Sequence, residues 1–190
     1  MTKCDVLGIC GSLRAKSCNA YALAAAAELM PPGMTLRIAS IAELPLYNQD
    51  VQDAGMPQSV TRLRDAIAQA DALLIASPEY NFSVTGALKN AVDWLSRTGP
   101  QPFKDKPVAI LSATAGPLGG ARCQYDLRRI LGCLEAQVLL RPEVFIGLCQ
   151  SKFDDAGCLI DAPTRKFIGD QMVAFERWII RLGARSLTGD

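Results

Sequence analysis

The stretch "GICGSLRAKSCNAYALAAAAELM", residues 8–30, joins an apolar run to an alanine-rich segment through a polar turn. The apolar residues from Asp5 to Cys10 predict a short buried strand. The segment from Asn19 to Met30 predicts a helix, because alanine and leucine favour that conformation. A strand that runs through a polar turn into a helix indicates an α/β fold, and the question is what the turn binds.

The same alternation continues along the chain. Further strands are expected at Thr35–Ala39, Ala72–Ser77, Pro107–Ser112 and Ala136–Leu140, and further helices at Gln58–Gln69, Gly86–Ser96, Gly120–Leu134 and Thr164–Leu182. This pattern favours a flavodoxin-like, doubly wound α/β fold, with a five-stranded parallel sheet in the order 2-1-3-4-5 and helices on both faces. We expect one domain over residues 1–190, because no repeat or linker interrupts the pattern.

Composition narrows the class of protein. The chain has 190 residues, of which 49% are apolar and 21% charged, and its net charge is +1. Such a charge favours neither nucleic acid nor an anionic membrane surface. No apolar run approaches the length of a membrane span, and the first residues, Met1 to Asp5, lead directly into the first strand without a signal peptide. We therefore expect a cytoplasmic protein with no nucleic-acid or membrane partner.

Cysteine and histidine content limit the chemistry. The seven cysteines include no Cys-x-x-Cys pair, and Cys4, Cys10, Cys133 and Cys149 lie in apolar surroundings, which predicts buried free thiols in a reducing compartment. The chain has no histidine, so the commonest metal ligand and the commonest general base are both absent. No metal site is expected, and the chemistry must come from a cofactor or from other residue types.

The first polar turn, residues 11–19, has the donors of a phosphate site. Ser12 and Ser17 offer hydroxyls, Arg14 a guanidinium and Asn19 an amide, beside the N-H groups that begin the helix. The turn is neither Gly-x-Gly-x-x-Gly nor a Walker A sequence, so a terminal monoester fits it better than a dinucleotide or a magnesium triphosphate. A plain helix cap with solvated Arg and Lys is the alternative.

A second alternative for this turn is a tyrosine phosphatase loop. Cys10, five intervening residues and Lys16-Ser17 come close to the Cys-x5-Arg-Ser sequence of the small phosphatases. Lysine cannot supply the two-pronged phosphate contact that arginine makes there. The chain also has no Asp-Pro pair to serve as the general acid, which makes this alternative the weaker one.

Two more loops follow the expected third and fourth strands. The loop from Pro78 to Thr85 places Tyr80 and Phe82 on either side of Asn81, which suits a flat heteroaromatic ring. The loop from Ala113 to Gly120 is rich in small residues, and its glycines allow a planar group to approach the backbone closely. Ligands of doubly wound sheets bind beyond the carboxyl ends of the strands, where all three loops should meet.

Three segments together carry a family resemblance. "GSLRAKSCN" (residues 11–19), "SPEYNFSVTGALKNAVDWLSR" (77–97) and "GGARCQYDLRRIL" (119–131) resemble the NADPH-dependent FMN reductase family, and most of all its bacterial chromate and quinone reductase branch. The resemblance implies a flavodoxin-like fold with bound FMN. The family pattern then maps cofactor contacts onto Ser12, Leu13, Arg14, Ser17, Cys18, Asn19, Pro78, Glu79, Tyr80, Asn81, Phe82, Ser112, Thr114 and Gly116. Phe82 stands where relatives often have tyrosine.

The resemblance also implies an activity. No catalytic side chain is expected, because the chemistry would take place at N5 of FMN, with NADPH or NADH as donor and quinones, flavins, chromate or azo compounds as acceptors. Donor and acceptor would use one ring face in turn, which is a ping-pong scheme. A flavodoxin-type electron carrier is the alternative, although such carriers are usually strongly acidic and this chain is nearly neutral.

An assembly is expected as well. Members of the family cover the flavin with a neighbouring subunit, which implies a homodimer or homotetramer. Trp94 falls off the apolar stripe of its helix and is a candidate interface residue, with partial burial in its own subunit as the alternative. Arg122, Tyr125 and Glu143 are candidates for a polar network across a second interface, and solvated surface charge is the alternative for them.

Overall fold

The computed structural model describes residues 4–186. Its strands are β1 (Cys4–Cys10), β2 (Met34–Ala39), β3 (Ala72–Ala76), β4 (Glu79–Tyr80), β5 (Ser83–Val84), β6 (Pro107–Ala113), β7 (Gln137–Val138) and β8 (Val144–Ile146). Its helices are α1 (Cys18–Glu28), α2 (Gln49–Ala54), α3 (Gln58–Gln69), α4 (Gly86–Leu95), α5 (Ala121–Cys133) and α6 (Ala162–Ser186), with a short 3-10 helix η1 (Cys149–Ser151).

The main sheet confirms the flavodoxin-like order. Strands β2, β1, β3 and β6 are parallel neighbours in that sequence, and β7 and β8 both pair with β6. The fifth position is therefore shared: β7 pairs with the beginning of β6 and β8 with its end. The strand predicted at Ala136–Leu140 is wrong in its extent, because Leu139 and Leu140 lie in the connection between β7 and β8.

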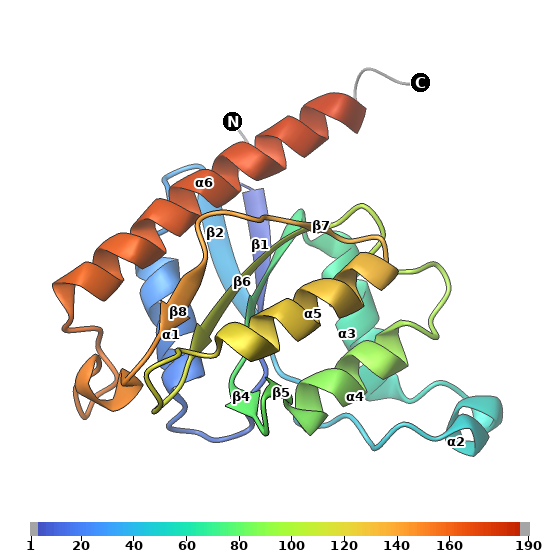
Figure 1. Cartoon of the computed structure of the whole chain (residues 1–190). Helices are drawn as coiled ribbons and strands as arrows, with labels where there is room; N and C mark the ends of the chain where they lie inside the picture. The colour runs from blue at the N-terminus through green and yellow to red at the C-terminus, as the bar shows by residue number, and fades with distance from the viewer. Residues whose placement is uncertain (1–3, 187–190) are drawn as a thin grey trace.

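Helices cover both faces of this sheet (Figure 1). One hydrophobic cluster joins α1 and α6 to one face, with Leu23, Met172 and Phe175 fully buried. The second cluster joins α3, α4 and α5 to the other face, where Ile67 and Leu127 are among the fully buried residues. Because both faces are covered, every residue of β3 and β6 is buried, which explains their continuous apolar sequences.

Polar caps set where the helices beside the carboxyl edge of the sheet begin. Ser17 Oγ accepts a hydrogen bond from Asn19 N at the start of α1. Thr85 Oγ1 accepts one from Leu88 N at the start of α4 and donates one to Gly11 O. The cap of α4 thus ties the second polar loop to the first.

Strand β8 and helix η1 were not predicted, and neither were two further features. Helix α2 has no buried residue and extends away from the body (Figure 1), while β4 and β5 form a hairpin within the loop after β3.

Between residues 4 and 186, no helix combines the length and the apolar character that crossing a bilayer requires.

The seven cysteines are all free thiols. Cys123 and Cys149 are buried and Cys4 and Cys10 partly buried, but Cys133 is exposed at the end of α5. The prediction of burial was therefore wrong for Cys133, because its apolar sequence neighbours face the sheet while Cys133 lies on the solvent side of the helix.

Candidate active site

A cavity of about 770 Å³ opens at the carboxyl edge of the sheet. Its walls come from all three polar loops, and the residues that line it are Ser12, Arg14, Ser17, Cys18, Asn19, Pro78, Glu79, Tyr80, Asn81, Phe82, Ala113, Thr114, Ala115, Gly116, Pro117, Leu118 and Arg122. A larger cavity, of about 1060 Å³, lies at the opposite, amino edge. Ligands of doubly wound sheets bind at the carboxyl edge, so we assign the site to the smaller cavity.

The loop after β1 builds the polar end of this cavity. Ser17 and Asn19 are both buried. The Asn19 amide does not stand free: Nδ2 donates to Ala113 O at 2.8 Å, and Oδ1 accepts from Ala113 N at 3.0 Å. Asn19 thereby fixes the start of α1 against the end of β6. Its side chain both lines the cavity and holds two of the cavity's walls together.

Arg14 is one of two cations that line the cavity, and the other, Arg122, is paired with Glu79. Arg14 is exposed, and it belongs to none of the ion pairs within the described part of the chain. Its backbone N-H donates to Ser12 Oγ at 3.3 Å, which leaves the Ser12 hydroxyl proton available to a ligand. An uncommitted guanidinium, two serine hydroxyls and the positive end of α1 make a set of donors suited to a phosphate.

The Cys10 thiol is poorly suited to nucleophilic catalysis. Burial raises the pKa of this thiol, and hydrogen bonds from the Ser12 backbone and the Ser17 side chain offset only part of the rise. A phosphatase nucleophile needs the opposite shift, because the thiolate is the attacking species. The site therefore does not support the tyrosine phosphatase alternative.

The loop after β3 forms a tight hairpin at the cavity mouth. Strands β4 and β5 pair antiparallel, and the two residues between them, Asn81 and Phe82, have positive φ angles of 50° and 69°. Two such residues in a row form the left-handed turn that suits a hairpin of this length. The turn leaves the Tyr80 and Phe82 rings exposed at the edge of the cavity.

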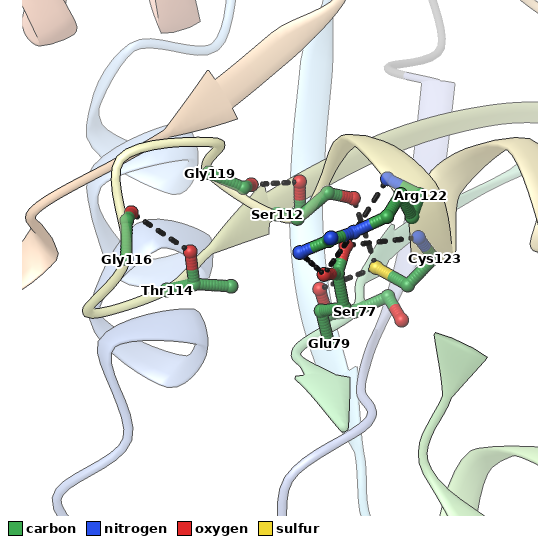
Figure 2. Close-up of polar contacts among 9 residues, drawn as sticks. Ser77, Glu79, Ser112, Thr114, Gly116, Gly119, Arg122 and Cys123 are labelled. Carbon is green, nitrogen blue, oxygen red and sulfur yellow. Dashed lines mark hydrogen bonds and ion pairs between the residues drawn. The ribbon is translucent and has the colours of Figure 1, made fainter. Parts of the chain in front are cut away.

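An ion pair clamps this hairpin to α5 (Figure 2). Glu79 Oε1 accepts from Arg122 Nε at 2.8 Å, and Glu79 Oε2 accepts from the backbone N-H groups of Arg122 and Cys123 at 3.0 and 3.2 Å. Helix α5 has no side-chain cap of its own, since Gly120 precedes it. The Arg122 guanidinium also lies over the Phe82 ring, 3.7 Å from its centroid.

The loop after β6 depends on close contacts to glycine. Ser112 Oγ donates to Gly119 O at 2.5 Å, and Thr114 Oγ1 donates to Gly116 O at 3.2 Å (Figure 2). Gly119 and Gly120 both have positive φ, and a Cβ atom at Gly119 would lie 2.6 Å from the Phe145 backbone. Only glycine fits there, because the loop packs directly against the backbone of β8.

The structure brings together most of the predicted cofactor residues. Of these, only Leu13 and Ser112 are absent from the cavity lining. Ser112 is fully buried, and its hydroxyl is already committed to Gly119 O and to the Gln124 amide. Sequence reasoning missed Arg122 as a cavity residue, because its partner Glu79 lies 43 positions away in the chain.

The predicted interface residues have different outcomes. The prediction for Trp94 was wrong, since this residue is fully buried in its own chain. The Tyr47 ring packs edge-on against Trp94, with the ring centroids 5.0 Å apart, and the Trp94 indole N-H donates to Pro45 O. Arg122 and Tyr125 are accessible, whereas the Glu143 carboxylate is mostly buried and pairs with Arg141 at 2.8 Å.

Comparison of the sequence with known proteins identifies a family with which the fold and the cavity agree. The family model described as NADPH-dependent FMN reductase matches residues 4–150. The chain belongs to this family. It is 51% identical over 177 residues to an NAD(P)H-dependent FMN reductase of Pseudomonas aeruginosa, covering 93% of this chain and 96% of that protein. It is 44% identical over 183 residues to a quinone reductase of Escherichia coli, covering 95% and 97%.

A solved structure agrees with these sequence matches. FerB, a flavoenzyme NAD(P)H:(acceptor) oxidoreductase of Paracoccus denitrificans, superimposes with a TM-score of 0.85 at 34% identity. The match covers 93% of this chain and 97% of FerB. The fold and the family together make this protein an oxidoreductase.

The cavity of this FMN reductase family member fits FMN. Arg14, the Ser12 and Ser17 hydroxyls and the start of α1 supply donors for a terminal phosphate. The exposed Tyr80 and Phe82 rings and Leu118 supply an apolar wall for a flat ring system. A volume of about 770 Å³ is ample for a ligand of this size.

Proposed function

We propose that this protein is an FMN-dependent NAD(P)H oxidoreductase that passes electrons to quinones. The observation that carries the proposal is the cavity at the carboxyl edge, whose phosphate donors and aromatic wall come from the three loops that match the family. Two relatives named for FMN and quinone reduction, both similar over almost their whole length, support it. Free flavins, chromate and azo compounds are further acceptors within the proposal.

The protein's own residues bind and orient the reactants. FMN, when bound, supplies the redox chemistry by accepting a hydride and passing the electrons on. Arg14, Ser12 and Ser17 hold the phosphate, while the hairpin from Glu79 to Val84 borders the ring. Backbone N-H groups of this loop would favour negative charge beside the ring. One open mouth serves both substrates, so the donor must leave before the acceptor enters.

Kinetics and absorbance test this function. The purified protein should show a flavin spectrum that bleaches rapidly when NADPH is added without oxygen. Double-reciprocal plots with a quinone should give parallel lines. Slow bleaching would instead identify an electron carrier, and intersecting lines would show that both substrates bind together. The same assay with NADH measures the donor preference.

A homodimer or homotetramer is part of the proposal. The exposed rings of Tyr80 and Phe82 at the cavity mouth are apolar surface that a second copy can cover. Arg122 and Tyr125 remain the proposed residues of a further interface, because they are accessible, whereas the Glu143 carboxylate is mostly buried and paired with Arg141 in its own chain. Light scattering after gel filtration should give at least twice the chain mass of 20.4 kDa. A fully active species of 20.4 kDa would contradict the assembly.

We also propose one domain over residues 1–190 and a cytoplasmic location. The two hydrophobic clusters lie on the two faces of one sheet, which supports a single cooperative unit. The seven free thiols support a reducing compartment. Unfolding in one transition, followed by both flavin absorbance and circular dichroism, is the expected result for one domain.

A further inference from the structure

Among the described residues, only three charged side chains line the cavity, and two of them form an ion pair. The three are Arg14, Glu79 and Arg122. Arg14 lies at the phosphate end, on the loop after β1. Glu79 and Arg122 lie at the other end, which the hairpin and the start of α5 form. The charge that an acceptor meets at this end is therefore set by the pair.

The Glu79 carboxylate holds Arg122 in a fixed position (Figure 2). Its Oε1 accepts from Arg122 Nε at 2.8 Å and lies 2.6 Å from Nη2. Its Oε2 accepts from the backbone N-H groups of Arg122 and Cys123. The Phe82 ring covers one face of the guanidinium, with the ring centroid 3.7 Å from Cζ. Arg122 therefore cannot turn toward a ligand without breaking both contacts.

The two partners of this pair differ in exposure. The side chain of Glu79 is 8% exposed and that of Arg122 is 43% exposed. A carboxylate buried to this extent needs a charged partner, because an unpaired charge in such a place is costly. The guanidinium, by contrast, lies where a ligand can approach it. Glu79 thus supplies the negative charge that cancels an accessible cation.

The surface around the pair is apolar. The rings of Tyr80 and Phe82 and the side chain of Leu118 are exposed, and Pro117 lines the cavity beside Leu118. A wall with aromatic faces and no net charge suits a flat, neutral acceptor such as a quinone. The same wall without the Glu79 carboxylate would carry one uncancelled positive charge and would attract anions.

We propose that Glu79 is a specificity residue: by neutralising Arg122, it makes the cavity mouth favour uncharged quinones over anionic acceptors. Its role is to position Arg122 and to cancel its charge, and it acts without touching the acceptor. The inference rests on the proposed function, because it takes this cavity to be the place where the acceptor binds. It adds the charge of the preferred acceptor and the residue that selects for it.

Two quinones that differ in charge test the inference. The FMN-loaded protein is assayed with NADPH and either 1,4-naphthoquinone or its 2-sulfonate, and the ratio of the two kcat/KM values is compared between variants. Glu79→Gln keeps an acceptor oxygen for Arg122 but removes the negative charge, so the ratio should shift roughly tenfold toward the sulfonate. Salt at about 0.5 M should remove most of this shift, because it screens charges at a partly exposed site. A purely structural effect would not depend on salt in this way.

Further variants separate charge from structural damage. Arg122→Gln leaves the Glu79 carboxylate without its cation and should shift the ratio the opposite way, toward the neutral quinone. The double variant with both substitutions should return the ratio to within about threefold of the unchanged protein. Asp126→Asn is the matched control: this carboxylate binds Ser83 of the same hairpin but does not line the cavity, so the ratio should stay unchanged.

The possible outcomes distinguish the inference from the proposed function. If the unchanged protein reduces 1,4-naphthoquinone but neither single variant alters the ratio, or salt does not affect the shift, the inference is overturned and the proposed function stands. Either single variant suffices for this decision, because the two should shift the ratio in opposite directions. An unchanged protein that binds no FMN or reduces neither quinone would overturn the proposed function, and the inference with it.

Discussion

Arg14 and Lys16 lie two positions apart on the same exposed loop, but only Arg14 lines the cavity. A hydrogen bond to a charged group is worth about 1.5–3 kcal/mol. Arg14→Ala should therefore raise the FMN dissociation constant by roughly 10- to 150-fold. Quenching of flavin fluorescence on titration with the cofactor-free protein measures this change.

Lys16→Ala is the control for this prediction. It removes the same charge from the same loop, so a general electrostatic effect would weaken FMN binding equally in both variants. We expect the Lys16 variant to stay within about threefold of the unchanged protein, because exposed charges contribute little. Equal losses in the two variants would contradict a specific contact between Arg14 and the phosphate.

Single residues also show where sequence reasoning reaches its limit. The type and spacing of Ser12, Arg14 and Ser17 sufficed to predict a phosphate site, because loop and helix start are local features. The contact of Asn19 with Ala113 spans 94 positions and could not be inferred from its neighbours. Trp94 looked like surface because it falls off the apolar stripe of α4, yet the segment that contains Pro45 and Tyr47 covers it.

At the scale of elements, α5 depends on a cap from a distant hairpin. Glu79 is the only side chain among the described residues that accepts from the backbone N-H groups of Arg122 and Cys123, and its carboxylate is 8% exposed. Glu79→Ala removes the carboxylate that accepts from these two N-H groups and from the Arg122 guanidinium. The substitution should lower the free energy of unfolding by about 1–3 kcal/mol. Glu79→Gln keeps an acceptor oxygen and should cost less. Urea unfolding followed by circular dichroism measures both.

The exposed pair Lys166–Asp170 on α6 supplies the control for the helix cap. Its side chains are 72% and 50% exposed, so Asp170→Ala should change the free energy of unfolding by less than about 0.5 kcal/mol. A similar effect at Glu79 and Asp170 would mean that the hairpin does not stabilise α5.

The elements differ in how well their sequences predict them. Helix α3 was placed correctly, because Val60, Leu63 and Ile67 recur at helical spacing and are all buried. The hairpin of β4 and β5 was missed because Asn81 and Phe82 adopt positive φ angles without a glycine to signal the turn. The end of the fifth strand was misplaced because Leu139 and Leu140 are apolar but leave the sheet.

At the scale of the whole molecule, the order of the sheet followed from the alternation of strands and helices alone. Parallel strands joined by helices allow few arrangements, and a five-stranded chain of this kind favours one of them. The site follows from the same order, since β1 and β3 are neighbours and their loops meet at the carboxyl edge. Burial of individual thiols does not follow from it, as exposed Cys133 shows.

Buried thiols make the stability of the whole protein depend on pH in alkali. Cys123 is fully buried, and burial first, with the carboxylates of Glu79 and Asp126 adding to it, raises the pKa of its thiol from 9.0 to about 11. The folded state therefore holds this proton between pH 9 and 11, where the unfolded chain has lost it. The stabilisation is complete below pH 9 and is lost as the pH rises toward 11.

Cys123→Ala should reduce this dependence. The unchanged protein should lose up to about 2 kcal/mol of unfolding free energy through this thiol by roughly pH 10.5, and the variant should lack that part of the decline. Urea unfolding at pH values from 8 to 10.5 measures the slope, which is the informative quantity because the smaller side chain also leaves a cavity that lowers stability at every pH. Cys133→Ala, at an exposed thiol, should keep the slope of the unchanged protein. Identical slopes in all three proteins would show that Cys123 ionises in the folded state as readily as in the unfolded chain.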